Sequence, residues 1–348
     1  MDRRIEVGVL GATGMVGQQF LQLLAAHPWF VPSWLAASER SQGRRYADAA
    51  PWRLDTPMPD LVGSQVLETA APGVGPRLVF SALDASVAGE LERAFAEAGH
   101  IVVSNARNHR MDQAVPLLVP EVNADHLGLL DRQGAERGWQ GAIVTNPNCS
   151  TVALTMALGP LRPFGLRSCL VTTMQAVSGA GYPGVPSLDI LGNVIPFISG
   201  EEEKIETETK KILGRFEGGV VHAHPLDVSA HTNRVPVIDG HTETVSVAFD
   251  TPPSFDDLRA AFDNFAGEPQ RLELPSAPVA PVVYVDEPNR PQPRFDARRG
   301  LGMTVSVGRL RPCKVLQWKF VALGHNTIRG AAGAAILNAE LMVAQGRV

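Results

Sequence analysis

A glycine-rich turn near the start of the chain constrains the fold most strongly. Gly11, Gly14 and Gly17 follow an apolar run over residues 5–10, and the apolar residues after them recur at helical spacing until His27-Pro28. Strand, glycine turn and helix in this order are typical of dinucleotide binding, because the backbone can approach a pyrophosphate at the helix N-terminus. The spacing Gly-x-x-Gly-x-x-Gly differs from the commoner Gly-x-Gly-x-x-Gly, and a surface turn without a ligand is the alternative. The context favours dinucleotide binding.

The pattern that follows extends a parallel sheet. Residues 78–83 and 101–104 are apolar runs of strand length, and residues 85–98 between them have helical character. Alternating strands and helices predict a Rossmann-type, doubly wound α/β sheet. The polar segment 104–110 follows a strand end, which is where such sheets build sites. An alanine-rich helix over 330–342 is expected to return and pack on this domain.

The second half of the chain has a different pattern. Residues 171–177 and 244–249 alternate with the period of half-buried strands, and a charged helix is expected over 201–213. Another strand is expected over 315–323, and the proline-rich residues 268–295 are expected to form an extended loop. Strands separated by long connections predict a second, α+β domain with a mostly antiparallel sheet.

Composition narrows the function classes. The chain has 348 residues, enough for two domains, with 45% hydrophobic and 19% charged residues, as in a folded globular protein. A net charge of −5 without a basic run gives no indication of nucleic-acid binding. No apolar stretch reaches membrane-spanning length, and residues 1–6 lack the features of a signal peptide. Three widely spaced cysteines fit a reducing compartment, so a cytoplasmic location is expected.

Cys149 is the candidate nucleophile. It follows Asn146-Pro147-Asn148, in which Asn148 can cap a helix that continues over 151–158. Cys149 would then lie in the first turn, where the helix dipole and free N–H groups stabilise a thiolate. An isolated cysteine is more often a small buried apolar residue. Combined with a dinucleotide fold, however, a reactive thiol suggests that an acyl group is captured as a thioester and then reduced.

The residues after the second expected strand bear on the choice of cofactor. The apolar run 34–37 is followed by Ser38, Arg40 and Ser41, at the distance from the glycine turn where the ribose is usually bound. The two hydroxyls and the several guanidiniums of residues 38–45 suit a 2′-phosphate. Glu39 is evidence against this interpretation, and the arginines could instead form an ordinary solvated face. We expect NADP rather than NAD.

Further candidates lie in the second half of the chain. Gln175 is a polar residue in an apolar strand, and residues 178–181 form a turn whose N–H groups could face a substrate. Arg234 suits a carboxylate or phosphate, and a neutral imidazole at His241 could take a proton from a thiol. On their own, His241 is more often a structural loop histidine and the acidic residues 201–203 a solvated helix start.

Six ordered motifs give the chain its resemblance to a known family. They are GATGMVG at 11–17, NPNC at 146–149, QAVSG at 175–179, GEEEK at 200–204, RVPV through GHT at 234–242, and HNTIRGA at 325–331. With these motifs, the chain resembles the aspartate-β-semialdehyde dehydrogenases, most closely their archaeal and fungal branch. Six motifs in order are far more specific than any one of them.

The resemblance implies a role for each matching residue. Cys149 would be the nucleophile, His241 the acid/base and Gln175 the residue that orients the acyl group. The substrate-binding residues would be Arg234 for the carboxylate, Glu201 for the ammonium group, Lys204 and Arg110 for the phosphate, and Asn148. The cofactor-binding residues would be Gly11, Thr13, Gly14, Met15, Val16, Gly17, Ser38, Arg40, Ser41, Ser81, Ser178, Gly179 and Asn326. No metal is implied.

The resemblance also implies a reaction and an assembly. The reaction would be NADPH-dependent reduction of β-aspartyl phosphate to aspartate semialdehyde through a Cys149 thioester, with release of inorganic phosphate, in the biosynthesis of lysine, threonine and methionine. The protein would be a homodimer or homotetramer with small-molecule ligands, and would contact neither nucleic acid nor membrane. The domains would be residues 1–148 with 325–348, which bind NADP, and 149–324, which carry catalysis and dimerisation.

Three alternatives remain at this point. A sister enzyme could reduce malonyl-CoA or another acyl thioester or acyl phosphate on the same scaffold. Glu201 discriminates here, because only a substrate with an amino group needs an acidic partner. An N-acetylglutamyl-phosphate reductase fits the acidic helix start and the spacing of Arg234 and His241 less well. A non-catalytic nucleotide-binding protein would be expected to have lost Cys149, Gln175, Arg234 and His241.

Overall fold

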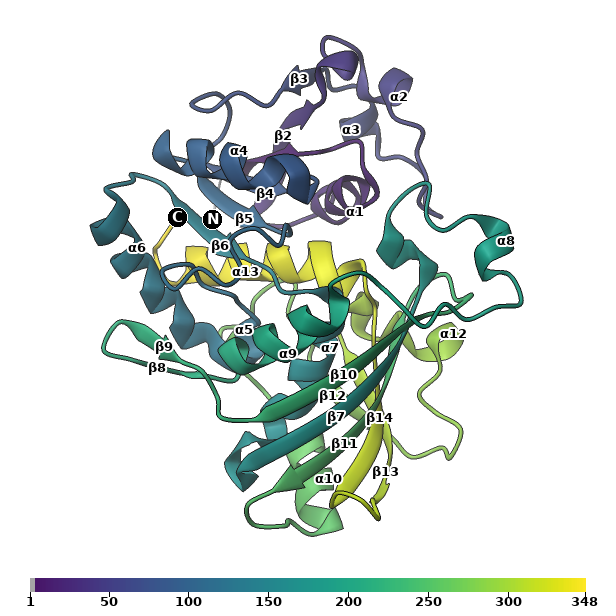
Figure 1. Ribbon diagram of the computed structural model, residues 1–348. Helices are drawn as coiled ribbons and strands as arrows, with labels where there is room; N and C mark the ends of the chain where they lie inside the picture. Colours follow the sequence, from purple (N-terminus) through teal and green to yellow (C-terminus); the bar gives the residue numbers. More distant parts are fainter. Residues whose placement is uncertain (1–3) are drawn as a thin grey trace.

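The computed structural model describes residues 4–348 and contains two six-stranded sheets and a small hairpin (Figure 1). Residues 1–3, where the segment compared with a signal peptide begins, lie outside the described residues. In Figure 1 the first sheet is at the top and the second at the bottom. This confirms the predicted fold class of a Rossmann-type sheet with a second α+β unit.

The first sheet is entirely parallel, with the order β3-β2-β1-β4-β5-β6. Its strands are β1 Ile5–Leu10, β2 Phe30–Ala37, β3 Leu67–Thr69, β4 Leu78–Ser81, β5 Ile101–Ser104 and β6 Ala142–Thr145. Its main helices are α1 Met15–Leu24, α4 Ala85–Glu97 and α13 Gly333–Ala344. The strands are apolar along their length because helices cover both faces of the sheet.

Alternate strand residues pack against different helices. Val7 and Phe80 lie in one core with Phe20 of α1 and Leu337 of α13. Their neighbours on the other face of the sheet, such as Val79, lie in a separate core with residues of α4. The C-terminal helix therefore returns to the first sheet as predicted (yellow in Figure 1), although it begins three residues later, after a π-helical turn over Ile328–Ala332.

The second sheet is mixed, with the order β10-β7-β11-β14-β13-β12. The three central pairings are antiparallel and the two outer ones parallel. Its strands are β7 Leu166–Gln175, β10 Asp227–Arg234, β11 His241–Phe249, β12 Val282–Val285, β13 Val305–Pro312 and β14 Trp318–Gly324. Helices α7 Cys149–Leu158, α9 Glu201–Ile212 and α10 Phe255–Asp263 share one core with it.

Residues 268–295 differ from the expected extended loop. They contain β12 and the short helices α11 Glu268–Arg271 and α12 Pro293–Asp296. Because β12 is an edge strand, it needs hydrogen bonds on one side only, and the prolines around it remove no ladder hydrogen bond from the sheet centre. The prolines correctly indicated that no long helix or strand spans this segment, but they gave no sign of the short strand β12 within it.

The remaining elements are short connections. The helices are α2 Tyr46–Ala49, α3 Asp60–Gly63, α5 Pro120–Asn123, α6 Leu129–Arg137 and α8 Ser187–Ile190. The hairpin is β8 Arg215–Glu217 with β9 Val220–His222. Turns of 3-10 helix span Glu39–Ser41, Ala124–Gly128, Gly159–Phe164, Val177–Ala180 and Arg299–Gly302. Within residues 4–348, no helix is both long and apolar enough to cross a membrane.

Candidate active site

The glycine turn leaves an open approach at the carboxyl end of β1. Gly11 has a φ of +73°, which favours glycine, and a Cβ atom on Gly17 would lie 2.3 Å from the Gly11 carbonyl oxygen. A Cβ atom on Gly14, the N-cap of α1, would meet no atom closer than 3.5 Å. The turn therefore packs tightly below and stays open above, as a pyrophosphate at a helix start requires. It carries the predicted residues Gly11, Thr13, Gly14, Met15, Val16 and Gly17.

A second group of predicted cofactor residues lies beside this turn. Ser38 follows β2, the strand next to β1, and Arg40 and Ser41 lie in the 3-10 turn after it. Ser38 and Arg40 are exposed and Ser41 is half-buried. This placement fits a phosphate on the ribose of a bound dinucleotide.

Ser81 is placed differently from its prediction. Its hydroxyl is fully buried and donates to Glu92 Oε1 at 2.6 Å, as does the hydroxyl of Ser104 at 2.7 Å. Burial raises the pKa of Glu92, and the hydrogen bonds from the two serine hydroxyls act in the opposite direction. The structure argues against a side-chain contact between Ser81 and a cofactor, because the hydroxyl is used to join β4, β5 and α4.

The start of α7 matches the prediction closely. Cys149 is the first residue of the helix, and Asn148 Oδ1 accepts hydrogen bonds from the N–H groups of Ser150 and Thr151 at 3.0 and 3.2 Å. Asn148 Nδ2 donates to Glu201 Oε1. Both ends of the Asn148 amide are therefore engaged in holding the helix start, which leaves a substrate-binding role for this side chain without support.

Cys149 and His241 are in contact. Cys149 Sγ lies 3.2 Å from His241 Nε2, and the N–H group of Ala176 donates to His241 Nδ1 at 3.1 Å. Since Nδ1 accepts a hydrogen bond, the neutral ring carries its proton on Nε2 and points it at the sulfur. Burial, and then the charges of Arg234 and His325, lower the pKa of His241 to about 3, so the ring is neutral near pH 7.

The pKa of the Cys149 thiol depends on more than its position at the helix start. Burial and the charge of Glu201 raise the pKa of Cys149 to about 12, while Arg110, Arg234 and the N–H group of Ser150 act in the opposite direction. The fold therefore acts against the low thiol pKa that the helix start alone predicts. Desolvation outweighs the helix start, and the thiol is protonated near pH 7.

Arg234 and Gln175 end two neighbouring strands side by side. They are direct partners in the parallel pairing of β10 with β7, and both side chains are buried. Arg234 Nη1 donates to the Ala176 carbonyl at 2.8 Å, and a Cβ atom on Gly179 would lie 2.9 Å from the same nitrogen. The turn with Gly179 therefore lies against Arg234 and His241, where a side chain would displace both.

The C-terminal motif reaches the same place. Asn326 Nδ2 donates to Ser178 Oγ at 2.7 Å, and Asn326 Oδ1 accepts from the N–H group of Gly240 at 2.9 Å. One buried amide thus joins the turn after β7 to the residue before His241. The predicted residues Ser178, Gly179 and Asn326 form one cluster, and it lies beside the catalytic candidates.

The acidic start of α9 faces the site. Glu201 is only 6% exposed, and Lys204 Nζ donates to its Oε2 at 2.8 Å. The Glu201 carboxylate is also close enough to raise the pKa of Cys149 and of Arg234 through its charge. The alternative that Glu201 belongs to a solvent-exposed helix start is therefore wrong.

Arg110 is buried, and one of its three side-chain nitrogen atoms has no hydrogen-bond partner among the described residues. Its Nη1 donates to Glu208 Oε1 at 2.9 Å and its Nη2 to the Asn105 carbonyl at 2.7 Å. Its Nε has no hydrogen-bond partner among residues 4–348, although Arg110 is only 7% exposed. An unpaired buried N–H group on a cation is a suitable donor for an anionic ligand.

The sequence interpretation missed Glu208 and Lys211, the inner partners of this group. A signal was present, because Glu201, Lys204, Glu208 and Lys211 follow one another at intervals of three and four residues and so lie on one face of a helix. A charged stripe of this kind usually faces solvent, which is why it was not assigned to the interior.

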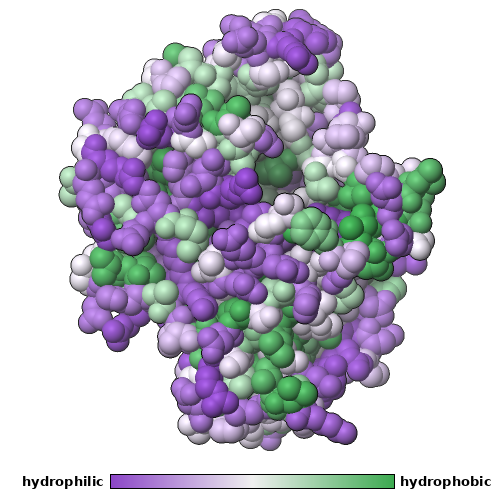
Figure 2. Space-filling view, in the orientation of Figure 1, coloured by the Kyte–Doolittle hydropathy of each residue, from purple (hydrophilic) through white to green (hydrophobic). Residues whose placement is uncertain are grey.

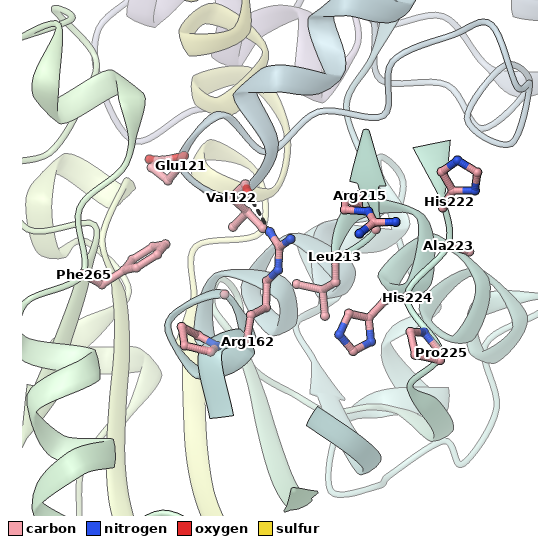
Figure 3. A pocket seen from close by; sticks show the side chains of 13 residues that line it. Glu121, Val122, Arg162, Leu213, Arg215, His222, Ala223, His224, Pro225 and Phe265 are labelled. Atoms are coloured by element: carbon pink, nitrogen blue, oxygen red, sulfur yellow. Dashed lines mark hydrogen bonds between the residues drawn. The ribbon is translucent and has the colours of Figure 1, made fainter. Parts of the chain in front are cut away.

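A pocket of about 650 Å³ lies away from these residues (Figure 3). Arg162 and His224 line it, and it adjoins Gly159 and Leu213 at the carboxyl ends of α7 and α9. Cys149 begins α7 at the other end, about 15 Å away at 1.5 Å per residue. No residue of the predicted site lines this pocket, so we do not place catalysis there.

Residues 4–348 contain no group of three or more His, Cys, Asp or Glu side chains that could hold a metal ion.

Comparison with known families divides the chain into two matching regions. Residues 6–130 match the profile described as "Semialdehyde dehydrogenase, NAD binding domain". Residues 158–329 match the profile described as "Semialdehyde dehydrogenase, dimerisation domain". The first match contains the glycine turn and the second contains Gln175, Arg234 and His241.

Individual relatives match over nearly the whole chain. The chain is 52% identical to the aspartate-semialdehyde dehydrogenase of Archaeoglobus fulgidus over 98% of each chain. It is 49% identical to that of Cryptococcus neoformans, over 99% of this chain and 98% of the relative. A solved structure of the Candida albicans aspartate-semialdehyde dehydrogenase with NADP has a TM-score of 0.91 and 43% identity, covering 99% of this chain and all of that one.

Proposed function

The chain belongs to the aspartate-semialdehyde dehydrogenase family, and we propose that the cluster around Cys149 and His241 is its catalytic site. The protein is an NADP-dependent oxidoreductase that interconverts β-aspartyl phosphate and aspartate semialdehyde. The observation that carries the assignment of the site is the contact between the thiol and the imidazole at the start of α7.

The residues at the carboxyl end of the first sheet fit a dinucleotide cofactor. The open turn at Gly14 would hold the pyrophosphate, and Ser38, Arg40 and Ser41 would hold the 2′-phosphate. NADPH supplies the hydride when bound, in the biosynthetic direction. Ser178, Gly179 and Asn326 would lie on the nicotinamide side, because they adjoin His241.

The reaction begins at Cys149. The thiol gives up its proton, which leaves with the departing phosphate as hydrogen phosphate, and the sulfur attacks the carbonyl carbon of the acyl phosphate. The C–O bond to phosphate breaks, phosphate leaves toward Lys204 and Arg110, and a thioester remains. Arg234 and Arg110 favour the thiolate, since their charges lower the thiol pKa in a site where burial raises it.

The resting hydrogen bonds support a donor role for His241, and the acid/base role stays a prediction that the pH profile tests. The His241 Nε2–H stabilises first the Cys149 thiolate and then the oxyanion that forms when hydride adds to the thioester carbonyl. The oxyanion collapses to the aldehyde and expels the thiolate, which again accepts this hydrogen bond. No step requires His241 to become charged.

Two side chains would recognise the two charged groups on the α-carbon of the substrate. Arg234 would bind the α-carboxylate and Glu201 the α-ammonium group, because both are buried next to Cys149 with opposite charges. Gln175 lies beside Arg234 in the strand register and would orient the acyl oxygen. Malonyl-CoA lacks an amino group and would leave Glu201 buried without a cationic substrate partner, so this alternative is not favoured.

The second unit would form the contact between copies of the chain. The matched profile is that of a dimerisation domain. Leu170 of β7 is 45% exposed, and Leu188, Leu191 and Phe197 around α8 are at least 68% exposed. Figure 2 shows hydrophobic residues gathered in the α8 region and over the second sheet. A homodimer or homotetramer would cover them.

The division of the chain into two units and its location in the cell are further proposals. We place the dinucleotide unit at residues 1–148 with 325–348, since α13 packs on the first sheet, and the catalytic unit at 149–324. The three cysteines are free, which agrees with a cytoplasmic location.

The experiment that tests the function is NADPH formation from aspartate semialdehyde and NADP, with and without inorganic phosphate. Strict dependence on phosphate that is lost in Cys149→Ser would support the acyl-phosphate reaction and the nucleophile together. Turnover without phosphate, or turnover retained in the variant, would contradict the scheme.

A further inference from the structure

Two buried charged residues of α9 have no role in the mechanism above. Glu208 is 2% exposed and Lys211 is 8% exposed, and both lie on the helix face that also carries Glu201 and Lys204. Burying a carboxylate or an ammonium group is costly unless each of its polar atoms is paired. Their partners therefore indicate what the two residues hold in place.

Glu208 joins the nucleophile helix to the predicted phosphate arginine. Its Oε1 accepts from Arg110 Nη1 at 2.9 Å, and its Oε2 accepts from the backbone N–H group of Asn148 at 2.7 Å. Asn148 directly precedes Cys149. One carboxylate thus fixes the guanidinium relative to the residue next to the reacting sulfur.

Lys211 fixes the segment that carries Arg110. Its Nζ donates to the carbonyl groups of Arg110, Asp112 and Val115 at 2.7, 2.7 and 2.9 Å. All three protons of the ammonium group are used. The backbone from 110 to 115 is therefore tied to α9 one helical turn beyond Glu208.

We propose that Glu208 and Lys211 are positioning residues that hold Arg110 in place for the phosphate of the substrate. The inference rests on the proposed function, in which Arg110 binds that phosphate. With Nη1 on Glu208 and Nη2 on Asn105, the guanidinium cannot rotate, and its unpaired Nε–H remains for the anion. Glu208 also fixes the distance between this donor and the start of α7.

Glutamine cannot replace Glu208 in this arrangement. Both carboxylate oxygens accept hydrogen bonds, whereas an amide has one oxygen and an NH₂ group that would face a second donor. In Glu208→Gln, therefore, either Arg110 or the Asn148 N–H group loses its partner. Glu208→Asp keeps both oxygens but is shorter by one methylene, so we expect a smaller change in the same direction.

The test is a kinetic double-mutant cycle in the oxidative direction, with Glu208→Gln, Arg110→Gln and the double variant. We expect Glu208→Gln to raise the KM for phosphate about 10-fold, the range of one hydrogen bond to a charged group. The KM for aspartate semialdehyde should change less than about 2-fold. In the Arg110→Gln background, Glu208→Gln should raise the phosphate KM no further, since it acts through Arg110.

Glu203→Gln is the matched control, because Glu203 is an exposed glutamate of the same helix. An unchanged phosphate KM in Glu208→Gln, or an equal effect with and without Arg110, would overturn the inference. If Glu208→Gln does not fold, as judged by circular dichroism, Glu208→Asp provides the same comparison. Protection of Cys149 from iodoacetamide by phosphate measures anion binding without turnover. An inactive protein in which Glu208 still controls this protection would contradict the proposed function and not the inference.

Discussion

Cys149 Sγ and His241 Nε2 lie 3.2 Å apart, although 92 positions separate the two residues in the sequence. The contact forms because α7 begins at Cys149 and β11 begins at His241, and the helix packs against that strand. The ring is held from its other side by the N–H group of Ala176. Nucleophile and donor are thus positioned by element ends, which places the reacting atoms on a rigid scaffold.

The neutral state of His241 predicts the pH profile. Its pKa is lowered to about 3, so kcat/KM should have no inflection near pH 6.5 and should rise with pH as more Cys149 becomes thiolate. His241→Asn should lower kcat about 10²–10³-fold, as expected when one oxyanion donor is lost. Initial rates from pH 5.5 to 9.5 would measure both. An inflection near 6.5 that disappears in His241→Asn would instead indicate an acid/base role.

The charge of Glu201 predicts the reactivity of the thiol. Because Glu201 raises the Cys149 pKa, Glu201→Gln should lower it and speed alkylation by iodoacetamide at pH 8. The same variant should raise the KM for aspartate semialdehyde, since the ammonium group loses its partner. Faster alkylation combined with weaker substrate binding would separate these effects from general damage to the site.

The alkylation experiment needs a background without Cys313. Both thiols are half-buried, but the pKa of Cys313 is lowered, mainly by the N–H group of Leu316, whereas that of Cys149 is raised. Cys313 would therefore react before Cys149. Cys313→Ser removes it, and Cys169 is fully buried. In the Cys313→Ser variant with an otherwise unchanged site, the rate of Cys149 alkylation should keep rising with pH beyond 9. A plateau near pH 8.5, as for an ordinary thiol, would contradict the burial argument.

Arg40 predicts the preference between the two dinucleotides. If its guanidinium holds the 2′-phosphate, Arg40→Ala should raise the KM for NADP by roughly 10-fold and leave that for NAD nearly unchanged. Arg44→Ala is the control, because Arg44 is an exposed arginine of the next turn. Equal losses with both dinucleotides would show that Arg40 stabilises the fold of the turn and does not read the phosphate.

Local signals were sufficient for the parts of the site that depend on neighbours in sequence. The Asn148 cap, the glycine turn and the helix start at Cys149 each follow from the chemistry of a few adjacent residues. The six motifs, read as a family resemblance, gave the reaction. The helix position alone does not give the thiol pKa, because desolvation depends on the complete fold.

The rest depends on contacts between distant segments. β10 was missed because its polar sequence, Asp227–Arg234, resembles a loop until one face is covered by α9. Glu208 and Lys211 resemble an ordinary solvated stripe until Arg110 and the 110–115 segment are placed against them. In both cases the sequence specifies the residue types, and only the packing determines which face is buried.

The last prediction concerns Gly330, which lies against the nucleophile. A Cβ atom there would be 2.7 Å from Cys149 Cβ and 2.9 Å from its Cα, closer than such contacts allow. Gly330→Ala should therefore displace the start of α7 and lower kcat at least 10-fold, because a displacement near 1 Å can cost far more. NADP binding, measured by fluorescence titration, should persist, since the glycine turn at the carboxyl end of β1 is untouched.

Gly134→Ala provides the matched control for this substitution. Gly134 lies within α6, and a Cβ atom there would have no neighbour within 4 Å. Alanine should raise the free energy of unfolding by up to about 1 kcal/mol at this position, through helix propensity alone. Activity should not change. If Gly330→Ala retained full turnover while Gly134→Ala behaved as expected, the close packing of Gly330 on Cys149 would not be what fixes the nucleophile, and the Asn148 cap with its two glutamates on α9 would be sufficient to hold it.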